Sequence, residues 1–121
     1  DAEAICEAVQ RPNMRFVELK TTEQQSVLHL HKSRQLLIKE RVGLSNHIRA
    51  LLSEFGIVLA VGVKVFEAQV PVLLTEDDNA LPALSRRTLN LMWTAYRDLR
   101  SLIHELDRVL ACWRAGVLAQ G

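Results

Sequence analysis

Apolar residues recur in steps of three and four along two long stretches of the chain, which is the spacing of amphipathic helices. The first stretch opens with Thr22 and Gln25, which fit a capping box, and Gly56 follows it as a C-terminal glycine. The second begins with Pro82 as a first helical residue and ends near Gly116. We therefore predict two long helices in an antiparallel hairpin, the first about 50 Å long at 1.5 Å per residue.

The first of these helices carries a heptad seam, the pattern of a coiled coil. Leucine fills its d positions and arginine fills two of its a positions. The seam consists of Val27, Leu30, Arg34, Leu37, Arg41, Leu44, Ile48, Leu51 and Phe55. The residues predicted to join protomers of a homo-oligomer are Leu30, Leu37, Leu44, Ile48 and Leu51. An arginine at an a position either fixes the register of such a seam or marks where it opens to admit an anionic ligand.

The pattern is less regular elsewhere. Asp1 to Val9 has helical spacing, the apolar run Ile57 to Val61 fits a strand or a buried coil, and Gly62 to Leu74 fits a short helix that Pro71 interrupts. The second long helix has an apolar face wider than a heptad seam, which predicts burial against more than one neighbour. The predicted fold is all-α: two long amphipathic helices in a hairpin or coiled coil, a short N-terminal helix and a mixed connector.

Composition narrows the class of protein. The chain has 121 residues, of which 49% are hydrophobic and 24% are charged, as in an ordinary globular domain or part of one. The net charge of +1 excludes a strongly basic nucleic-acid arm but leaves room for a local basic face. No apolar run of about 18 residues is present, so no membrane span is expected. The first residue is Asp1 and the first methionine is Met14, so we expect a fragment of a longer protein.

One basic face stands out on the first long helix. Five basic residues lie between His31 and Arg49, and this range contains one acidic residue, Glu40. The five are Lys32, Arg34, Lys39, Arg41 and Arg49. Such a stripe is typical either of a helix that follows a phosphate backbone or of an ordinary solvated face.

Acidic residues and metal-binding types give little sign of a complete active site. Asp1, Glu3 and Glu7 could bind Mg²⁺, although acids in a first helical turn more often interact with the helix dipole. His29 and His31 are two residues apart and point away from each other on a helix, so they cannot share a metal. The chain has no CxxC pair, no P-loop and no GxSxG or GxGxxG motif, and two distant cysteines favour a reduced, cytoplasmic compartment.

Eight segments together resemble one family of mobile-element proteins. They are residues 1–8, 11–17, 20–21, 23–25, 34–41, 46–49, 51–58 and 77–82. In these segments the chain resembles the DEDD-type transposases of bacterial insertion sequences, in the family numbered one hundred and ten. The block from Arg11 to Val58 is distinctive as a whole. After Arg114 the sequence departs from the Pro-Gly-rich motif that the family usually has there.

The resemblance implies a nuclease fold of the RuvC type, a helical coiled-coil region and a C-terminal domain with a catalytic serine. It implies Mg²⁺-dependent DNA cleavage and rejoining by oligomers that a guide RNA directs. Asp1 matches the last acid of the family's motif, and so would be a catalytic and metal-binding residue of the parent protein. Residues 1–20 would form the edge of the nuclease domain and residues 21–121 the helical oligomerisation region. A lone carboxylate cannot hold Mg²⁺ for phosphoryl transfer, so we expect no tight metal site and no cleavage by this chain alone.

Two alternatives stay open from the residues themselves. The chain could be a helical homodimerisation module with no role in nucleic-acid binding, which the net charge of +1 favours. It could also be an autonomous metalloenzyme that uses Asp1, Glu3 and Glu7. A bacterial cytoplasmic location, with DNA and guide RNA as partners of the parent protein, is the prediction that accompanies the transposase resemblance.

Overall fold

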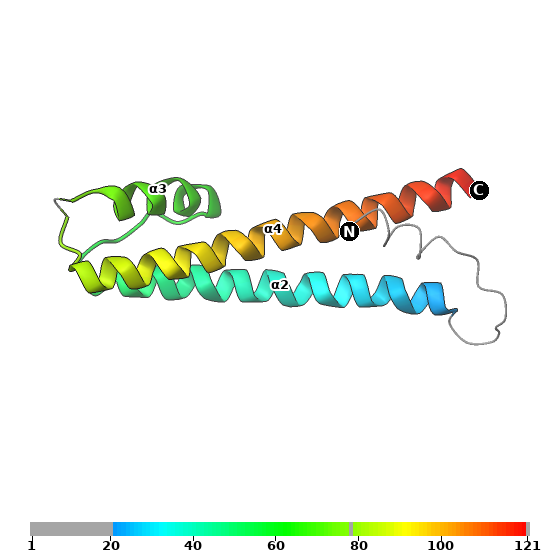
Figure 1. Cartoon of the computed structure of the whole chain (residues 1–121), viewed down its shortest axis with the longest axis horizontal. Coiled ribbons are helices and arrows are strands. Elements are labelled where there is room, and N and C mark those ends of the chain that lie inside the picture. Colours follow the sequence, from blue (N-terminus) through cyan, green and yellow to red (C-terminus); the bar gives the residue numbers. More distant parts are fainter. Residues whose placement is uncertain (1–20, 78, 121) are drawn as a thin grey trace. The chain divides into compact units, whose positions relative to one another are not determined.

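The computed structural model describes residues 21–77 and 79–120, and within that part of the chain all regular structure is helical (Figure 1). With the labels of Figure 1, α2 is Thr22–Ser53, α3 is Val63–Thr75 and α4 is Ala83–Gln120. The predicted all-α fold with two long helices is confirmed. The predicted helix at residues 1–9 and the segment before Thr21 lie outside the described residues.

Thr21, and not Thr22, caps α2. The Gln24 backbone N–H donates to Thr21 Oγ1 at 3.1 Å, and the Thr21 N–H donates to Gln24 Oε1 at 3.0 Å. This is the reciprocal pair of a capping box, one residue before the predicted pair of Thr22 and Gln25. Each threonine has a glutamine three residues later, so the sequence offers two registers, and the helix begins in the earlier one.

Gly56 ends α2 as predicted. Its φ of 79° lies in the left-handed region, which costs a glycine little. The Ile57 N–H bonds to the Leu52 carbonyl at 3.1 Å and the Gly56 N–H to the Ser53 carbonyl at 3.0 Å. These two bonds form a Schellman motif, which satisfies carbonyls that the helix leaves without partners.

Two of the predicted helix breaks are wrong. Pro71 lies inside α3, which continues to Thr75, and Gly116 lies inside α4, which continues to Gln120. A proline in a helix interior costs about 3 kcal/mol, and burial of Phe66, Val70 and Leu74 on the same helix offsets this cost. An interior glycine costs only about 1 kcal/mol, too little to stop a helix without help.

The connector between the long helices contains α3 and no strand among its described residues. Residues 57–60 are coil, and this run is only partly covered, since Val58 is 82% exposed. The choice between strand and buried coil is thus decided in favour of a half-covered coil. Pro82 precedes α4, which begins at Ala83, and the Pro82 carbonyl accepts from the Arg86 N–H at 2.9 Å.

The chain divides into two compact units, which are described separately. Unit 1 comprises residues 1–38 and 101–121, described over 21–38 and 101–120. In it, the Arg34 guanidinium pairs with the Asp107 carboxylate at 2.5 Å, which joins α2 to α4. Ile103, Val109 and Leu110 of α4 are buried in this unit.

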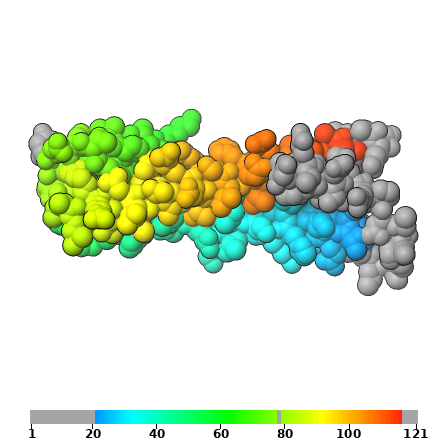
Figure 2. All heavy atoms as spheres, in the orientation of Figure 1, coloured from blue at the N-terminus to red at the C-terminus, as the bar shows by residue number. Residues whose placement is uncertain are grey.

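Unit 2 comprises Lys39–Arg100 and holds one hydrophobic core. α2, α3 and α4 all contribute, and the space-filling view shows α3 directly against the start of α4 (Figure 2). The buried members are Ile48, Leu52, Phe66, Val70, Leu74, Leu81, Leu89, Trp93 and Tyr96. Here α4 is covered by two helices, as its wide apolar face predicts.

Candidate functional site

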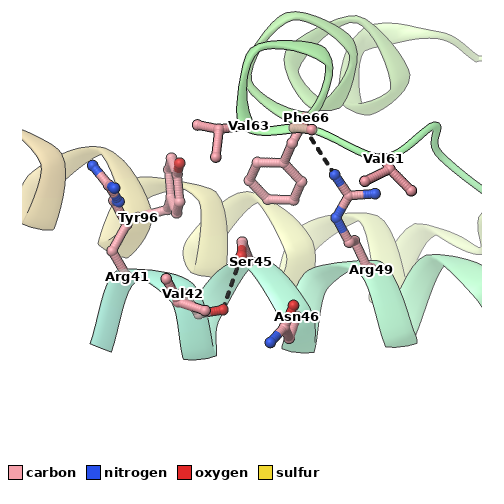
Figure 3. Close-up of a pocket in the computed structure, with 10 residues that line it drawn as sticks. Arg41, Val42, Ser45, Asn46, Arg49, Val61, Val63, Phe66 and Tyr96 are labelled. Carbon is pink, nitrogen blue, oxygen red and sulfur yellow. Dashed lines mark hydrogen bonds between the residues drawn. The ribbon is translucent and has the colours of Figure 1, made fainter. Parts of the chain in front are cut away.

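A hollow of about 450 Å³ opens in unit 2 between the second half of α2, the start of α3 and α4 (Figure 3). Its α2 wall comes from Arg41, Val42, Ser45, Asn46 and Arg49. These positions recur at steps of three and four, so one face of the helix presents all of them. The remaining lining residues are Val61, Gly62, Val63, Phe66 and Tyr96.

The walls of this hollow are mostly apolar. Val42 is 49% exposed, Val63 is 56% exposed and Val61 is 95% exposed, so the rim offers valine methyl groups to solvent. Phe66 and Tyr96 close the floor and are each 1% exposed. Single exposed valines are ordinary, but three around one concave site mark a place where a ligand could gain apolar contact.

Arg49 is occupied by its own chain. Its guanidinium donates to the carbonyls of Leu59, Ala60 and Gly62, at 3.4, 3.0 and 3.0 Å. It also lies over the Phe66 ring, with Cζ 5.2 Å from the ring centroid. Arg49 therefore holds the loop before α3 in place. Its predicted contact with phosphate stays a prediction, and both terminal nitrogens of the guanidinium already donate to backbone carbonyls.

Arg41 differs from Arg49. It is half-buried beside Tyr96, and no hydrogen bond or ion pair joins its guanidinium to another described residue (Figure 3). Among the residues that the structure describes, no acid lines the hollow, which has two arginines in its wall. The Glu67 carboxylate, which contacts the lining residue Tyr96, is already bonded to Tyr96 and Arg100. Arg41 is consequently a cation in an apolar setting that is available to an anion.

Tyr96 is a fixed donor in the floor. Its phenol donates to Glu67 Oε2 at 2.7 Å, and its ring stacks on Trp93 with centroids 5.2 Å apart. Burial first, and then the hydrogen bond and negative charge of Glu67, raise the pKa of Tyr96 to about 12. The positive charges of Arg41 and Arg100 oppose this rise. The phenol stays neutral at physiological pH and does not supply a negative charge to the hollow.

The five predicted basic residues are not equivalent. Arg34 is paired with Asp107 in unit 1, whereas Arg41 and Arg49 share the hollow of unit 2. Lys32 and Lys39 are exposed to solvent. Of the five, Arg41 combines partial burial with a guanidinium that forms no hydrogen bond or ion pair to another described residue. Nucleic-acid contact by these five residues stays a prediction.

The predicted oligomerisation residues fall in two places. Leu44, Ile48 and Leu51 belong to the core of unit 2 or contact it, and Ile48 has no exposed surface. Leu30 and Leu37 are half-buried in unit 1. In unit 2, therefore, residues of the seam pack against other helices of the same chain. Their role in contacts between chains stays a prediction.

Metal sites receive no support within the described part of the chain. No group of three or more histidine, cysteine, aspartate or glutamate residues gathers there in a way that could hold a metal ion. The four histidines His29, His31, His47 and His104 are all exposed. Asp1, Glu3 and Glu7 lie outside the described residues. A search of the described helices finds none apolar and long enough to cross a membrane.

Sequence reasoning missed a second polar network at the end of α3. The Arg86 guanidinium donates to the carbonyls of Leu73 and Leu74, at 2.9 and 3.0 Å, and to Asn79 Oδ1. The Asn79 amide donates to the same Leu73 carbonyl at 2.8 Å. Arg86 thus caps α3 from α4. Nothing local in the sequence marks this pairing, because it depends on tertiary contact between two helices.

Curated relatives of the chain are transposases. It is 45% identical over 110 residues to the transposase for insertion sequence element IS1111A of Coxiella burnetii, covering 91% of this chain and 30% of that protein. A putative transposase of Sinorhizobium fredii is 44% identical, with coverage of 91% and 28%. The transposase for insertion sequence element IS1328 of Yersinia enterocolitica is 40% identical, with coverage of 91% and 32%.

The chain spans roughly a third of the length of these relatives. No family model matches it, and no solved structure matches it significantly. The predicted resemblance to transposases of bacterial insertion sequences is confirmed by the curated relatives.

Proposed function

Because this chain is homologous to part of the insertion-sequence transposases, we propose that it is a helical segment through which such a transposase contacts nucleic acid and joins its protomers. The observation that carries the nucleic-acid part is Arg41, whose guanidinium has no hydrogen bond or ion pair to a described residue. It lies in an apolar hollow that no acid of the described part of the chain lines. A guanidinium of this kind is suited to a phosphate group. The exposed Lys39 on the same helix adds positive charge.

The parent activity is part of the same proposal. The whole protein would cleave and rejoin DNA strands with Mg²⁺ and use DNA and guide RNA as partners in the bacterial cytoplasm. Asp1 would supply one of its metal-binding, catalytic carboxylates, together with acids from outside this chain. A lone carboxylate cannot hold Mg²⁺ for phosphoryl transfer, so we expect the chain alone neither to bind Mg²⁺ tightly nor to cut DNA.

A salt series tests the nucleic-acid part. The 121-residue chain is titrated with a structured RNA and with a DNA duplex at increasing salt concentration. Phosphate contacts release counterions, so affinity should fall steeply as salt rises. Binding that does not change with salt, or no binding at low salt, would contradict the proposal and leave the alternative below.

The alternative is a helical homodimerisation module without a nucleic-acid role. The balanced net charge of +1 and the heptad seam favour it. Light scattering coupled to size-exclusion chromatography measures the mass of the isolated chain. A dimer or larger species is expected under both readings, and a monomer at high concentration would remove the oligomerisation part of each. A dimer that ignores RNA and DNA would select the alternative.

A further inference from the structure

We propose that the Arg41 hollow receives one unpaired nucleotide of a single-stranded loop, with its phosphate on Arg41 and its base against the valine wall. This rests on the proposed function and names the form of nucleic acid that the site would take. The ligand chemistry is a phosphate joined to a flat, largely apolar ring. Single-stranded RNA and single-stranded DNA both supply it, and the test separates them.

The charge of the hollow selects an anion. Among the described residues, its wall contains Arg41 and Arg49 and no carboxylate, and both terminal nitrogens of Arg49 donate to backbone carbonyls. Arg41 keeps its donors, since the described residues offer it no hydrogen bond or ion pair. A planar guanidinium binds two phosphate oxygens at once, and partial burial strengthens that interaction by excluding water.

The size and walls of the hollow select a ring over a bare phosphate. A volume of about 450 Å³ lies within the range of small-molecule sites, which runs from about 300 to about 1,000 Å³. Val42, Val61 and Val63 present apolar surface that inorganic phosphate would leave uncovered. Phe66 and Tyr96 lie behind these valines and are almost fully buried. The base would therefore contact mainly the valine side chains and little of the two aromatic rings.

The same geometry disfavours a base pair. Bases in a duplex are stacked and paired, so their faces are not available to a side pocket, whereas loop bases can turn outward. The polar groups at the hollow fit the edge of such a base. The Asn46 side chain is exposed, and its amide can both donate and accept. The Ser45 hydroxyl donates to the Val42 carbonyl at 2.8 Å, so its oxygen keeps acceptor capacity.

The test uses the full 121-residue chain and three fluorescent ligands that carry 2-aminopurine at one position. The ligands are an RNA hairpin with the probe in its loop, a single-stranded DNA of equal length and a blunt RNA duplex. Fluorescence of the probe rises when it leaves its stack. We expect a rise with the hairpin, and the DNA arm reports whether the ribose hydroxyl matters. The duplex should bind more weakly, without the rise.

Variants assign the signal to the hollow. Arg41→Ala should weaken hairpin binding about tenfold or more, the equivalent of one lost charged contact. Val61→Asp places a carboxylate on a residue that is 95% exposed, so it should reduce binding without affecting the fold. Arg87→Ala is the matched control, because Arg87 is exposed in the same unit and does not line the hollow. It should change affinity less than about twofold. Thermal unfolding followed by circular dichroism verifies that each variant folds.

The outcomes separate this inference from the proposed function. If the hairpin binds but Arg41→Ala and Arg87→Ala behave alike, or the duplex gives the same affinity and signal, the inference is overturned while nucleic-acid binding stands. If no ligand binds, both fail. If an acidic peptide binds, requires Arg41 and is not displaced by the hairpin, the occupant is a protein segment, and the nucleotide site is rejected.

Discussion

The phenol of Tyr96 donates a 2.7 Å hydrogen bond to one carboxylate oxygen of Glu67, while Arg100 pairs with the other oxygen at 3.2 Å. Tyr96 and Arg100 lie on α4 and Glu67 lies on α3, so one carboxylate joins the two helices twice. Tyr96 is also the single tyrosine of the chain, which makes its ionisation visible by absorbance without interference from another phenol.

The first prediction concerns that ionisation. A spectrophotometric titration of the folded chain should show a midpoint near 12, against an ordinary value of about 10, because burial and the Glu67 carboxylate raise the pKa of Tyr96. The folded state holds the proton more tightly than the unfolded state. The contribution of protonated Tyr96 to the free energy of unfolding is therefore complete below about pH 10 and is lost as the pH rises toward 12.

The control for this prediction is Tyr96→Phe. It removes the phenolic hydroxyl and leaves the aromatic ring. The wild type and the variant share all lysines and arginines, so the difference between their curves of stability against pH gives the contribution of Tyr96 alone. At neutral pH the variant should lose about 1–3 kcal/mol in urea unfolding, as expected for a hydrogen bond to a charged group. A folded-state midpoint near 10 would contradict the buried, bonded phenol.

The second prediction compares two arginines of α2. Arg49→Ala should destabilise the chain by about 1–3 kcal/mol, because three carbonyls lose a charged donor and the Phe66 ring loses its cation. Arg34→Ala should cost less than about 1 kcal/mol, because both side chains of its ion pair with Asp107 are more than a third exposed to solvent. Urea unfolding at low and high salt measures both, and only the Arg34 effect should shrink with salt. A loss from Arg49→Ala below about 1 kcal/mol, no larger than that from Arg34→Ala, would contradict the structural role assigned to Arg49 in the loop.

The third prediction concerns two glycines with opposite roles. Gly43 lies exposed within α2, and a Cβ there would meet nothing within 4 Å, so Gly43→Ala should stabilise the chain by about 1 kcal/mol. Gly56 has equal space but a φ of +79°, so Gly56→Ala should destabilise it by roughly 1–2 kcal/mol. Thermal unfolding of the two variants measures both changes in stability, and packing cannot explain a difference because both sites are open. Gly43→Ala should raise the unfolding temperature and Gly56→Ala should lower it, and changes of the same sign would contradict the prediction.

The fourth prediction tests the register of the α2 cap. Thr21→Ala removes the acceptor of the Gln24 N–H and should cost about 1 kcal/mol in unfolding free energy. Thr22→Ala should stay close to wild type, because the cap does not use its hydroxyl. Helix content by circular dichroism at several temperatures provides a second readout. A larger loss of unfolding free energy from Thr22→Ala than from Thr21→Ala would indicate that the cap uses Thr22 and Gln25, as the sequence alone predicts.

Periodicity predicted the long helices well because burial enforces it. The face of α4 that carries Leu89, Trp93 and Tyr96 is the face that the core covers. Local breaking signals predicted less. The sequence predicts that Pro71 interrupts its helix and that Gly116 ends one, and both helices continue through these residues. An interior proline costs about 3 kcal/mol, which burial on the same helix can offset, and an interior glycine costs only about 1 kcal/mol.

The site was harder to predict than the helices. The seam pattern marks Arg34 and Arg41 as unusual, and one of the two roles it allows, an opening that admits an anion, is the role proposed for Arg41 and its hollow. The sequence could not show that Arg34 finds Asp107, 73 positions away, while Arg41 finds no partner among the described residues. Nor could it show that Arg49 turns to the loop before α3. Ion pairing between helices depends on their relative rotation, which no local pattern specifies.

The two ends of α3 are each held by an arginine from another helix: Arg49 at the Gly62 carbonyl and Arg86 at the Leu73 and Leu74 carbonyls. A short helix usually frays from its termini, and here both termini are the anchored points. Its backbone amides should therefore exchange with deuterium together, in a single opening event that releases the whole element. The weak position is internal, at Pro71, where the Glu67 carbonyl lacks the usual donor, so any hinge in this element would form in its middle.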